Sequence, residues 1–429
     1  MAQTSHKASN GGATSRQICL EVPAQSAEPL AAIAESDGVR EHLHFFTREK
    51  RWINERHLEV CRIPAPTFQE QERAEHLARL LAGMGHESEI DRAGNVIAPV
   101  VFERGAPFVA LTAHMDTVLA PRQPAEVTQR PNGVLAGPGV ADNGAGLAAL
   151  LAIARTLKAG PPLRDCRNNL LLAATVGEEG EGNLSGMRHL CRQSGNGRRA
   201  GAFLVLDGAA TDHITTQALG SRRFEIVLNG PGGHSWSDFG NANPVHALAR
   251  AVAAFTRLEL PAGPRSSINV GLIEGGASVN AIPAAARAKV DIRSESNPAI
   301  DAIVAALEAA VDAAVEEENR RSTGATISCR MREIGSRPAA GLAPDARILA
   351  CLRAVDAHLG IRARLDCAST DANIPLSLGR EAATIGAGGS GGGAHTSDEW
   401  FNPEGRDIGL KRIFLTLLLL LRGAPEASC

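Results

Sequence analysis

Hydrophobic and polar positions follow two periods along this 429-residue chain. Residues 41–84 and 144–160 place apolar side chains at helical spacing; the first stretch closes at a glycine suited to a helix C-cap, and the second ends in Gly160. Short apolar or β-branched runs bounded by turn residues predict strands at 95–102, 108–116, 168–177 and 201–208. Alternation of these elements favours an α/β fold: a mostly parallel sheet with helices on both faces.

The pattern changes after Gly220. Strand-like runs and helix-like runs then follow in the order βαββαβ, with segments at 222–230, 243–260, 266–276, 285–294, 298–321 and 325–335. That order matches a split βαβ sandwich, an α+β domain. We therefore expect residues 219–337 to form an inserted domain within a discontinuous domain made of residues 41–218 and 338–429.

The two ends of the chain add less. Residues 1–40 have no apolar run behind a basic start, which predicts an N-terminal arm without a signal peptide and with little order. The apolar run 413–423 has about half the length that a membrane span needs, so it predicts a helix that closes the core. These patterns indicate a protein without a membrane anchor.

Composition and charge exclude several classes of function. A formal net charge of −3 leaves no basic surplus for nucleic acid or for an anionic membrane. The eight cysteines are scattered without a CxxC pair, which argues against a thiolate zinc site and against a disulfide scaffold. Reduced thiols are typical of the cytoplasm, and small molecules or peptides remain as the expected partners.

Two adjacent carboxylates, Glu178 and Glu179, end the apolar run "LLLAATVGEEGEG". Two neighbouring anions repel each other, and burying either one requires a cation, a raised pKa or a hydrogen-bonding partner. A solvated loop tip is the ordinary interpretation of such a pair taken alone. Its position directly after a predicted strand makes a functional interpretation worth testing against the rest of the chain.

Other polar residues also follow predicted strands or adjoin them. His114 and Asp116 are two positions apart in "LTAHMD", so Asp116 is placed to hold the ring of a metal-bound His114. Each residue alone also fits a surface pair, a helix cap or a turn. Together they form a set of nitrogen and oxygen donors at one sheet edge, which suits two zinc ions: His114, Asp142, Glu178, Glu179, Asp207 and His395.

The motifs HMD, ADNG, GEEGEG, LDG, PGGHS, GASVNAIP, VDIR and AH occur in this order over residues 45–420. In this the chain resembles the dizinc metallopeptidase family that includes peptidase T, aminoacylase, carboxypeptidase G and the acetylornithine and succinyl-diaminopimelate deacylases. The resemblance implies two divalent metal ions, most commonly Zn²⁺, with Co²⁺ or Mn²⁺ as substitutes. It also implies a cis peptide bond between Asp142 and Asn143.

The resemblance assigns a role to each donor. Asp142 would bridge the two metals, with His114 and Asp207 on one and Glu179 and His395 on the other. Glu178 would remain free as the general base, with a pKa raised toward neutrality by a closed site. The side-by-side carboxylates would thus divide the work, one as ligand and one as base.

The inserted domain receives its roles from the same resemblance. His234 would reach the active site of a partner subunit in a homodimer and stabilise the oxyanion. Asn280 and Arg293 match positions that hold the substrate backbone or its carboxylate, although Arg293 also fits a salt bridge on the sheet surface. Gly392 lies in the run "GAGGSGGGAH", which would either offer backbone N–H donors to an anion or form a flexible loop.

The function expected from these features is metal-dependent cleavage of an amide bond in a small peptide, as in a di- or tripeptidase. The segments "TVGEEGEGNLSG" and "GPGGHSWSDFG" favour this activity over that of a biosynthetic deacylase. An N-acyl-amino-acid amidohydrolase or a glutamate-releasing carboxypeptidase is the alternative. A non-catalytic binding protein on the same fold is a third interpretation, and it predicts no hydrolysis even with metal restored.

Overall fold

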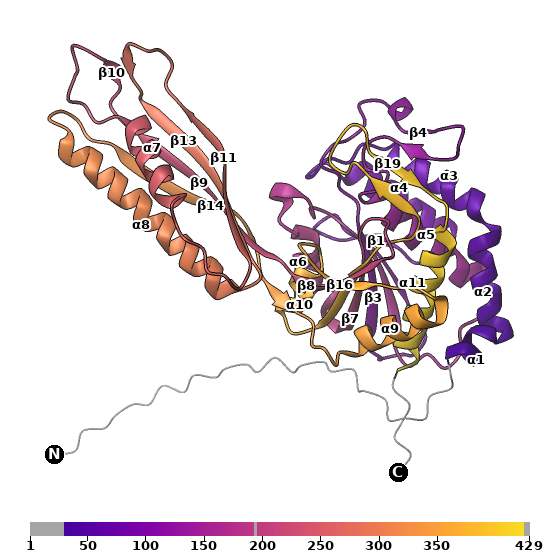
Figure 1. Ribbon diagram of the computed structural model, residues 1–429. Helices are drawn as coiled ribbons and strands as arrows, with labels where there is room; N and C mark the ends of the chain where they lie inside the picture. Colours follow the sequence, from indigo (N-terminus) through magenta and orange to yellow (C-terminus); the bar gives the residue numbers. More distant parts are fainter. Residues whose placement is uncertain (1–29, 193–194, 424–429) are drawn as a thin grey trace, which may run out of the picture.

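The computed structural model describes residues 30–192 and 195–423. It consists of a larger α/β domain and a smaller domain that extends from it, drawn in magenta to orange (Figure 1). The chain leaves the larger domain after β8 (His213–Ala218) and returns before β15 (Ala340–Gly341). The expected insertion at 219–337 coincides with the elements between these two strands.

A nine-stranded sheet forms the centre of the larger domain, in the order β1-β2-β6-β3-β7-β17-β8-β15 with β16 also paired to β8. Strands β6, β3, β7 and β17 run parallel, and antiparallel pairs extend the sheet at both ends. The remaining strands of this sheet are β1 (Glu89–Ile90), β2 (Val96–Val100), β3 (Phe108–His114), β6 (Asn169–Thr175), β7 (Ala200–Leu206), β16 (Arg364–Ala368) and β17 (Glu381–Ile385).

Both faces of the sheet are buried, because successive strand residues point to opposite sides. In β6, Leu170 and Leu172 join one hydrophobic core, whereas Leu171 and Ala173 join another. The shorter helices α6 (Ser185–Cys191) and α10 (Asn373–Ser377) cover the second face. The core on the first face is shared by helices α4 (Gln71–Gly83), α5 (Gly144–Ala159), α9 (Arg347–Leu359) and α11 (Arg406–Arg422), which contact the sheet, and by α1 (Leu30–Glu35), α2 (Asp37–Arg48) and α3 (Lys50–Cys61), which pack on those helices. The predicted α/β architecture with helices on both faces is confirmed.

The smaller domain has a hydrophobic core of its own. Its antiparallel sheet has the order β11-β13-β9-β14, and helices α7 and α8 pack against this sheet (Figure 1). The chain order of these elements is βαββαβ, as the pattern predicts. Their bounds are β9 (Gly220–Asn229), α7 (Pro244–Phe255), β11 (Ser266–Gly275), β13 (Ala285–Ser294), α8 (Asn297–Arg321) and β14 (Ser328–Arg337).

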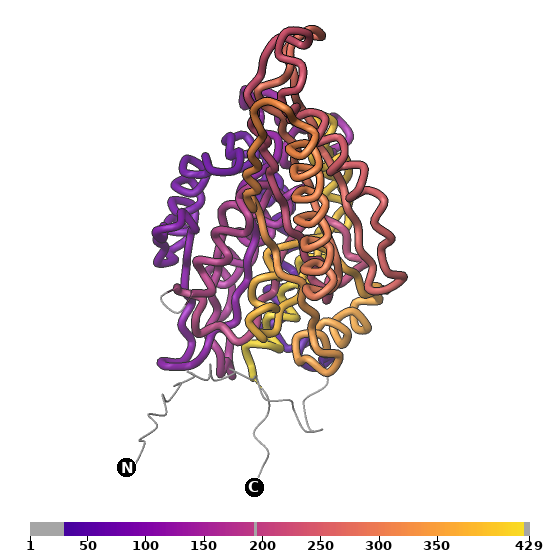
Figure 2. Tube along the Cα trace, turned by 90° about the vertical axis from the view of Figure 1, so that its left-hand side faces the viewer, coloured from indigo at the N-terminus to yellow at the C-terminus, as the bar shows by residue number. Residues whose placement is uncertain are grey.

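The remaining strands of the described residues form two short sheets. Strands β10 (Gly233–His234) and β12 (Ala281–Ile282) pair at the end of the smaller domain that points away from the larger one (Figures 1 and 2). The other sheet has the order β18-β19-β5-β4 and lies on the larger domain. It consists of β4 (Thr128–Gln129), β5 (Leu135–Ala136), β18 (Ser390–Gly392) and β19 (Trp400–Asn402).

Some elements end differently from the pattern. Residues 30–40, expected to belong to a loosely ordered arm, are helical, because Ile33, Ala34 and Val39 are buried against the main core. Residues 1–29 of that arm lie outside the described part of the chain. The helical stretch at 41–84 is interrupted after Cys61, where two prolines at 64 and 66 cannot continue a helix.

The C-terminal apolar run lies in α11, which is buried along most of its length against the sheet. Among the helices of residues 30–192 and 195–423, none is long and apolar enough to cross a membrane. The six cysteines in the described part of the chain are unpaired thiols.

Candidate metal centre

Three strands of the larger domain deliver donors to the same edge of the sheet. His114 is the last residue of β3, Asp207 follows β7, and Glu178 and Glu179 follow β6 after the turn at Gly177. That glycine has a φ of 62°, a left-handed conformation that side-chain-bearing residues seldom adopt. The turn aims both carboxylates back over the ends of the strands.

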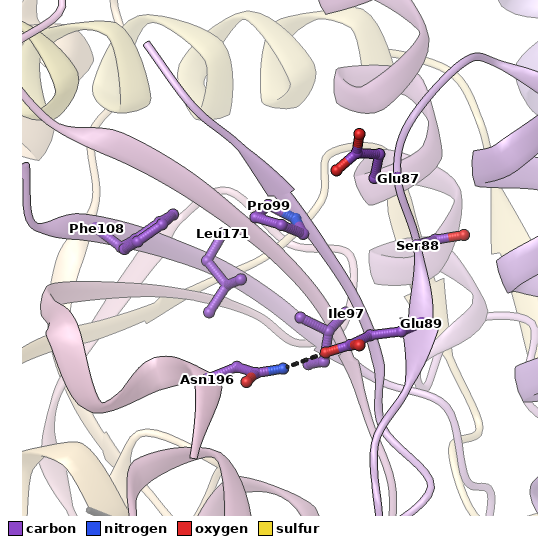
Figure 3. Close-up of a pocket in the computed structure, with 8 residues that line it drawn as sticks. All are labelled: Glu87, Ser88, Glu89, Ile97, Pro99, Phe108, Leu171 and Asn196. Carbon is purple, nitrogen blue, oxygen red and sulfur yellow. Dashed lines mark hydrogen bonds between the residues drawn. The ribbon is translucent and has the colours of Figure 1, made fainter. Parts of the chain in front are cut away.

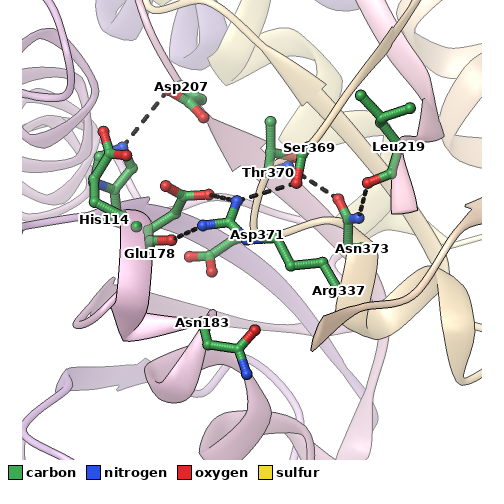
Figure 4. A network of polar contacts seen from close by, with 12 residues as sticks. His114, Glu178, Asn183, Asp207, Leu219, Arg337, Ser369, Thr370, Asp371 and Asn373 are labelled. Carbon is green, nitrogen blue, oxygen red and sulfur yellow. Dashed lines mark hydrogen bonds and ion pairs between the residues drawn. The ribbon is translucent and has the colours of Figure 1, made fainter. Parts of the chain in front are cut away.

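Asp142 lies between two histidines. Its Oδ1 is 3.1 Å from Nε2 of His114, and its Oδ2 is 3.1 Å from Nε2 of His395. His114 Nε2 is also 3.7 Å from Asp207, and His395 Nε2 is 2.9 Å from Glu179 (Figure 4 shows the His114 side). Three triads each bring their donor atoms within 4.8 Å of one another: His114–Asp142–Asp207, Asp142–Glu179–His395 and His114–Glu178–Glu179.

The charges at this edge are closely coupled. Burial opposes ionisation of Asp142, but hydrogen bonds from His114 and His395 lower the pKa of its carboxyl overall. The hydrogen bond with Asp142 raises the pKa of His395 to about 9. Burial raises the pKa of the Glu179 carboxyl. So many carboxylates beside two imidazoles form a donor set that suits divalent cations.

Asp116 lies beside the ring of His114 and also contacts the turn that carries Glu178 and Glu179. Nδ1 of His114 lies 3.1 Å from the backbone oxygen of Asp116 and 3.5 Å from its carboxylate. The carboxylate of Asp116 accepts the backbone N–H groups of Glu178 and Glu179 at 3.0 and 2.9 Å. Asp116 therefore faces the histidine with its main-chain oxygen and its carboxylate, and the same carboxylate fixes the Glu-Glu turn.

Glu178 is buried beside Arg337, with 3.0 Å between Oε1 and Nη1 (Figure 4). Arg337 also donates to the backbone oxygen of Glu178. Burial raises the pKa of the Glu178 carboxyl well above its usual value, and the Arg337 guanidinium opposes part of this rise. The raised pKa is the property that the sequence argument required of a general base.

Arg337 is a residue that sequence reasoning missed. It ends β14, at the return from the smaller domain, and its Nη1 also donates to Ser369 at 3.0 Å. Its Nε is buried without a hydrogen-bond partner in the described part of the chain. An arginine placed directly before a proline at an expected domain boundary was the available signal.

Glu399 was missed as well, although it lies four residues after His395. Its buried carboxylate accepts three backbone N–H groups, from Gly139, Ala141 and Asp142, at 2.6, 2.7 and 2.8 Å. These bonds hold the loop that carries Asp142, which is why a buried anion is tolerated here. The expected cis peptide bond between Asp142 and Asn143 is present at the end of this loop.

A second buried acid lies behind the donors. Asp371 accepts a hydrogen bond from the Thr175 hydroxyl at 2.6 Å, and burial raises the pKa of its carboxyl to about 6. Its other carboxylate oxygen, Oδ1, is buried without a partner in the described part of the chain. The sequence "STDAN" around it carried no pattern that set this residue apart.

A cavity of about 360 Å³ opens beside Asp142 and Asp207. Gly392, expected to contact substrate, is part of its lining. Another cavity of about 340 Å³ lies over β2 and β6, with Ile97 and Leu171 beneath and Glu87 and Glu89 at its side (Figure 3). Two of the candidate donors, Asp142 and Asp207, line the first cavity and none lines the second, so the first is the one that adjoins the site.

The residues expected from the smaller domain are not brought to this centre within one chain. His234 and Asn280 lie together at the exposed tip, where Ser235 N donates to the backbone oxygen of Asn280 at 3.0 Å. Arg293 lies on β13 and pairs with Asp291 at 2.7 Å. The salt-bridge alternative for Arg293 thus describes its observed contact.

Comparison with known proteins decides the family. A profile of the peptidase family M20/M25/M40 matches residues 110–418. The chain belongs to this family. The resemblance drawn from the motifs is thereby confirmed, and the chain is a hydrolase of the peptidase and amidohydrolase class.

Relatives of the M20/M25/M40 chain are similar over part of its length. A succinyl-diaminopimelate desuccinylase from Paracoccus denitrificans is 29% identical over 270 residues, which cover 58% of this chain and 69% of that protein. A probable carboxypeptidase from Aspergillus terreus is 31% identical over 222 residues, which cover 49% of each. The chain thus matches about half the length of the fungal relative.

Solved structures share the fold. An aminopeptidase PepT from Bacillus cereus superposes with a TM-score of 0.68 at 19% identity, covering 86% of this chain and 98% of that one. A tripeptidase from Staphylococcus aureus gives 0.71 at 18% identity, covering 87% and 98%. A dinuclear metal-binding M20 peptidase from Bacillus subtilis gives 0.64 at 15% identity, covering 89% and 99%. At these identities the likeness establishes the two-domain M20 fold.

Proposed function

We propose that the chain hydrolyses an amide bond of small peptides, as a di- or tripeptidase, with two Zn²⁺ ions held by His114, Asp142, Glu179, Asp207 and His395. The position of Asp142 between the two imidazoles carries this proposal, because one carboxylate oxygen faces each histidine. Co²⁺ or Mn²⁺ would suit the same donors. Two divalent ions at such a site polarise the scissile carbonyl and lower the pKa of a water molecule.

Glu178 is the general base in this proposal. Its carboxylate takes a proton from the attacking water and delivers it to the leaving amine nitrogen. Arg337 keeps Glu178 oriented, and Asp116 fixes the turn from which it projects. Glu178 forms a donor triad with His114 and Glu179 but is absent from the two triads that share Asp142, so the proposal assigns proton transfer to Glu178 and metal binding to Glu179.

His234 is the proposed oxyanion donor, supplied by a second copy of the chain in a homodimer. Its Nδ1 accepts the backbone N–H groups of Trp236 and Ser237 at 3.2 and 3.3 Å. A ring that accepts at Nδ1 carries its proton on Nε2, which leaves an N–H to donate. Asn280 beside it would bind the substrate backbone. Arg293 is paired with Asp291, so it would bind the substrate carboxylate only if that carboxylate replaced Asp291 as its partner.

The unpaired cysteines support a reducing compartment, and we propose the cytoplasm as the location. The sequence relatives favour a second candidate reaction, because a desuccinylase and probable carboxypeptidases are among them. The alternative substrate is therefore an N-acyl amino acid or a peptide cut at its C-terminal residue.

The test is a panel of dipeptides, tripeptides and N-acyl amino acids, offered to the zinc-loaded protein. The account expects free peptides to be cleaved with the highest kcat/KM. Glu178→Gln should keep both metals and lose at least about 10²-fold in kcat. Glu179→Gln should lose one metal. No hydrolysis of any member by fully loaded protein would contradict the proposal and favour a binding role.

A further inference from the structure

The cavity beside the proposed metal centre has a polar floor that crosses three strands. Thr384 of β17 pairs with Thr215 of β8, and Thr215 pairs with Asp366 of β16. Directly paired residues in neighbouring strands are about 5 Å apart, so the three form a continuous row. All three line the cavity. The row begins on β17, which pairs with the strand that precedes Asp207, and it ends at the carboxylate of Asp366.

Small residues leave the rest of the cavity open. Glycine and alanine supply much of its wall: Gly208, Ala209, Ala210, Gly391, Gly392 and Ala394. A pocket with this wall accepts an extended chain. The hydroxyls on its floor and the carboxylate at its end suit a polar or charged terminus more than an apolar side chain.

The free charge in this cavity is negative. Its lining carboxylates are Asp142, Asp207 and Asp366, of which the first two are proposed metal ligands. Asp366 forms no ion pair with any described residue, and its Oδ1 accepts the N–H of Cys367 at 2.9 Å. The lining imidazole of His213 is 3.0 Å from Asp212, which is its own partner.

Cations near β16 stay outside the cavity. Burial raises the pKa of the Cys367 thiol, and the charge of Arg265 opposes this rise. A hydrogen bond with the neighbouring histidine and the charge of Arg364 lower the pKa of the Asp212 carboxyl. Neither arginine lines the cavity. A cationic ligand group would therefore find in Asp366 a carboxylate without a competing partner. A charged hydrogen bond of this kind is among the stronger polar contacts in proteins.

In the proposed reaction the leaving amine lies beside Glu178, which leaves this cavity to the acyl side of the scissile bond. Glu178, which passes its proton to the leaving amine, does not line it, and neither does Arg337. Strands lie about 4.8 Å apart, so β16 is about 14 Å from β7, which carries Asp207. The two aspartate side chains fill part of this span. The remainder suits an ammonium on the four-carbon stem of lysine, and it is too long for an α-amino group next to the scissile carbonyl.

We propose that Asp366 binds the side-chain ammonium of the residue on the acyl side of the scissile bond, so that the preferred substrates are peptides with lysine or ornithine at that position. This inference rests on the proposed amide hydrolysis. It adds the class of substrate and a residue that selects it.

The experiment compares lysyl-alanine with norleucyl-alanine, which differ in the ammonium while sharing the α-amine and the leaving group. In the zinc-loaded wild type, kcat/KM should be about 10- to 100-fold higher for the lysyl peptide. Asp366→Asn keeps an acceptor for Cys367 N–H and should abolish most of that ratio. Asp212→Asn, a neighbouring exposed carboxylate outside the cavity, is the matched control and should keep it.

Charge reversal extends the test. Asp366→Arg should shift the preference toward glutamyl-alanine. Equal rates on the two peptides in the wild type, or an unchanged ratio in Asp366→Asn, would overturn the pocket assignment while leaving amide hydrolysis standing. Absence of hydrolysis on every peptide would instead overturn the proposed function, and the pocket assignment with it.

Discussion

Polar residues at the edge of the larger sheet and at the tip of the smaller domain differ in their burial and in their contacts. At the edge of the larger sheet, every donor except the exposed His395 is partly or fully buried, and each of them contacts another within one chain. At the tip of the smaller domain, His234 is exposed, and Trp236, Phe239 and Val279 around it are 86%, 88% and 101% exposed. The first region is complete in a single chain, whereas the second presents polar and apolar groups without a covering surface.

The difference separates two kinds of functional residue. Donors at strand ends are positioned by the fold itself, because parallel strands end at one edge. Residues at a protruding tip gain a role only when another surface meets them. Exposed large apolar side chains beside a histidine with a free N–H are typical of such a surface.

The largest expected effect concerns the tip. His234→Ala should lower kcat by about 10²- to 10³-fold with normal metal content, because an oxyanion donor is lost. Mixing this variant with Glu178→Gln under conditions of subunit exchange should restore about a quarter of the wild-type activity, since half of the dimers then contain one intact site. Activity assays after exchange measure this directly.

Two controls make the mixture decisive. Each variant alone should stay inactive after the same treatment. Absence of recovery in an exchanged mixture would show that the tip does not serve a neighbouring site. A protein that remains monomeric at assay concentration would lead to the same conclusion.

An intermediate effect is expected at the loop that carries Asp142. Glu399→Ala removes the acceptor for three backbone N–H groups and should weaken zinc binding by about 10- to 100-fold, as loss of a supporting contact to a metal ligand does. Competition with a chromophoric chelator measures the affinity. Glu404→Gln, at an exposed position five residues on, serves as control. Equal affinities in the two variants would show that Glu399 does not position Asp142.

The smallest effect is a change in pH dependence. Arg337 lowers the pKa of the Glu178 carboxyl, so Arg337→Met should raise that pKa. Since the base acts in its ionised form, the acid limb of the kcat/KM profile should move to higher pH. Arg188→Met is the control, because Arg188 lies beside the same strand end and donates to Ser336 rather than to Glu178. An acid limb that does not shift in Arg337→Met would show that Arg337 does not set the pKa of the general base.

Much of the centre could be predicted from sequence, because its donors follow apolar runs. His114 is the last residue of a strand, Asp207 and the Glu-Glu pair follow other strands, and the strand pattern alone brings them to one edge. Burial of both faces of β6 likewise follows from its continuous apolar run. These features depend on local sequence and on sheet geometry.

Other features depend on contacts between distant segments. Arg337 meets Glu178 across 159 positions, and Glu399 meets Gly139 across 260. The spacing of residues within a short segment of the sequence cannot predict such pairs. Helix formation at residues 30–40 similarly depends on the core that buries Ile33 and Val39.

The central claim is that Asp142 bridges two metal ions while Glu178 stays free. Anomalous diffraction from zinc-loaded crystals tests it most directly. The account predicts two peaks about 3.5–4 Å apart, one beside His114 and Asp207 and the other beside Glu179 and His395, with Asp142 between them. A single peak under saturating zinc, or a peak coordinated by Glu178 in place of Glu179, would contradict the account.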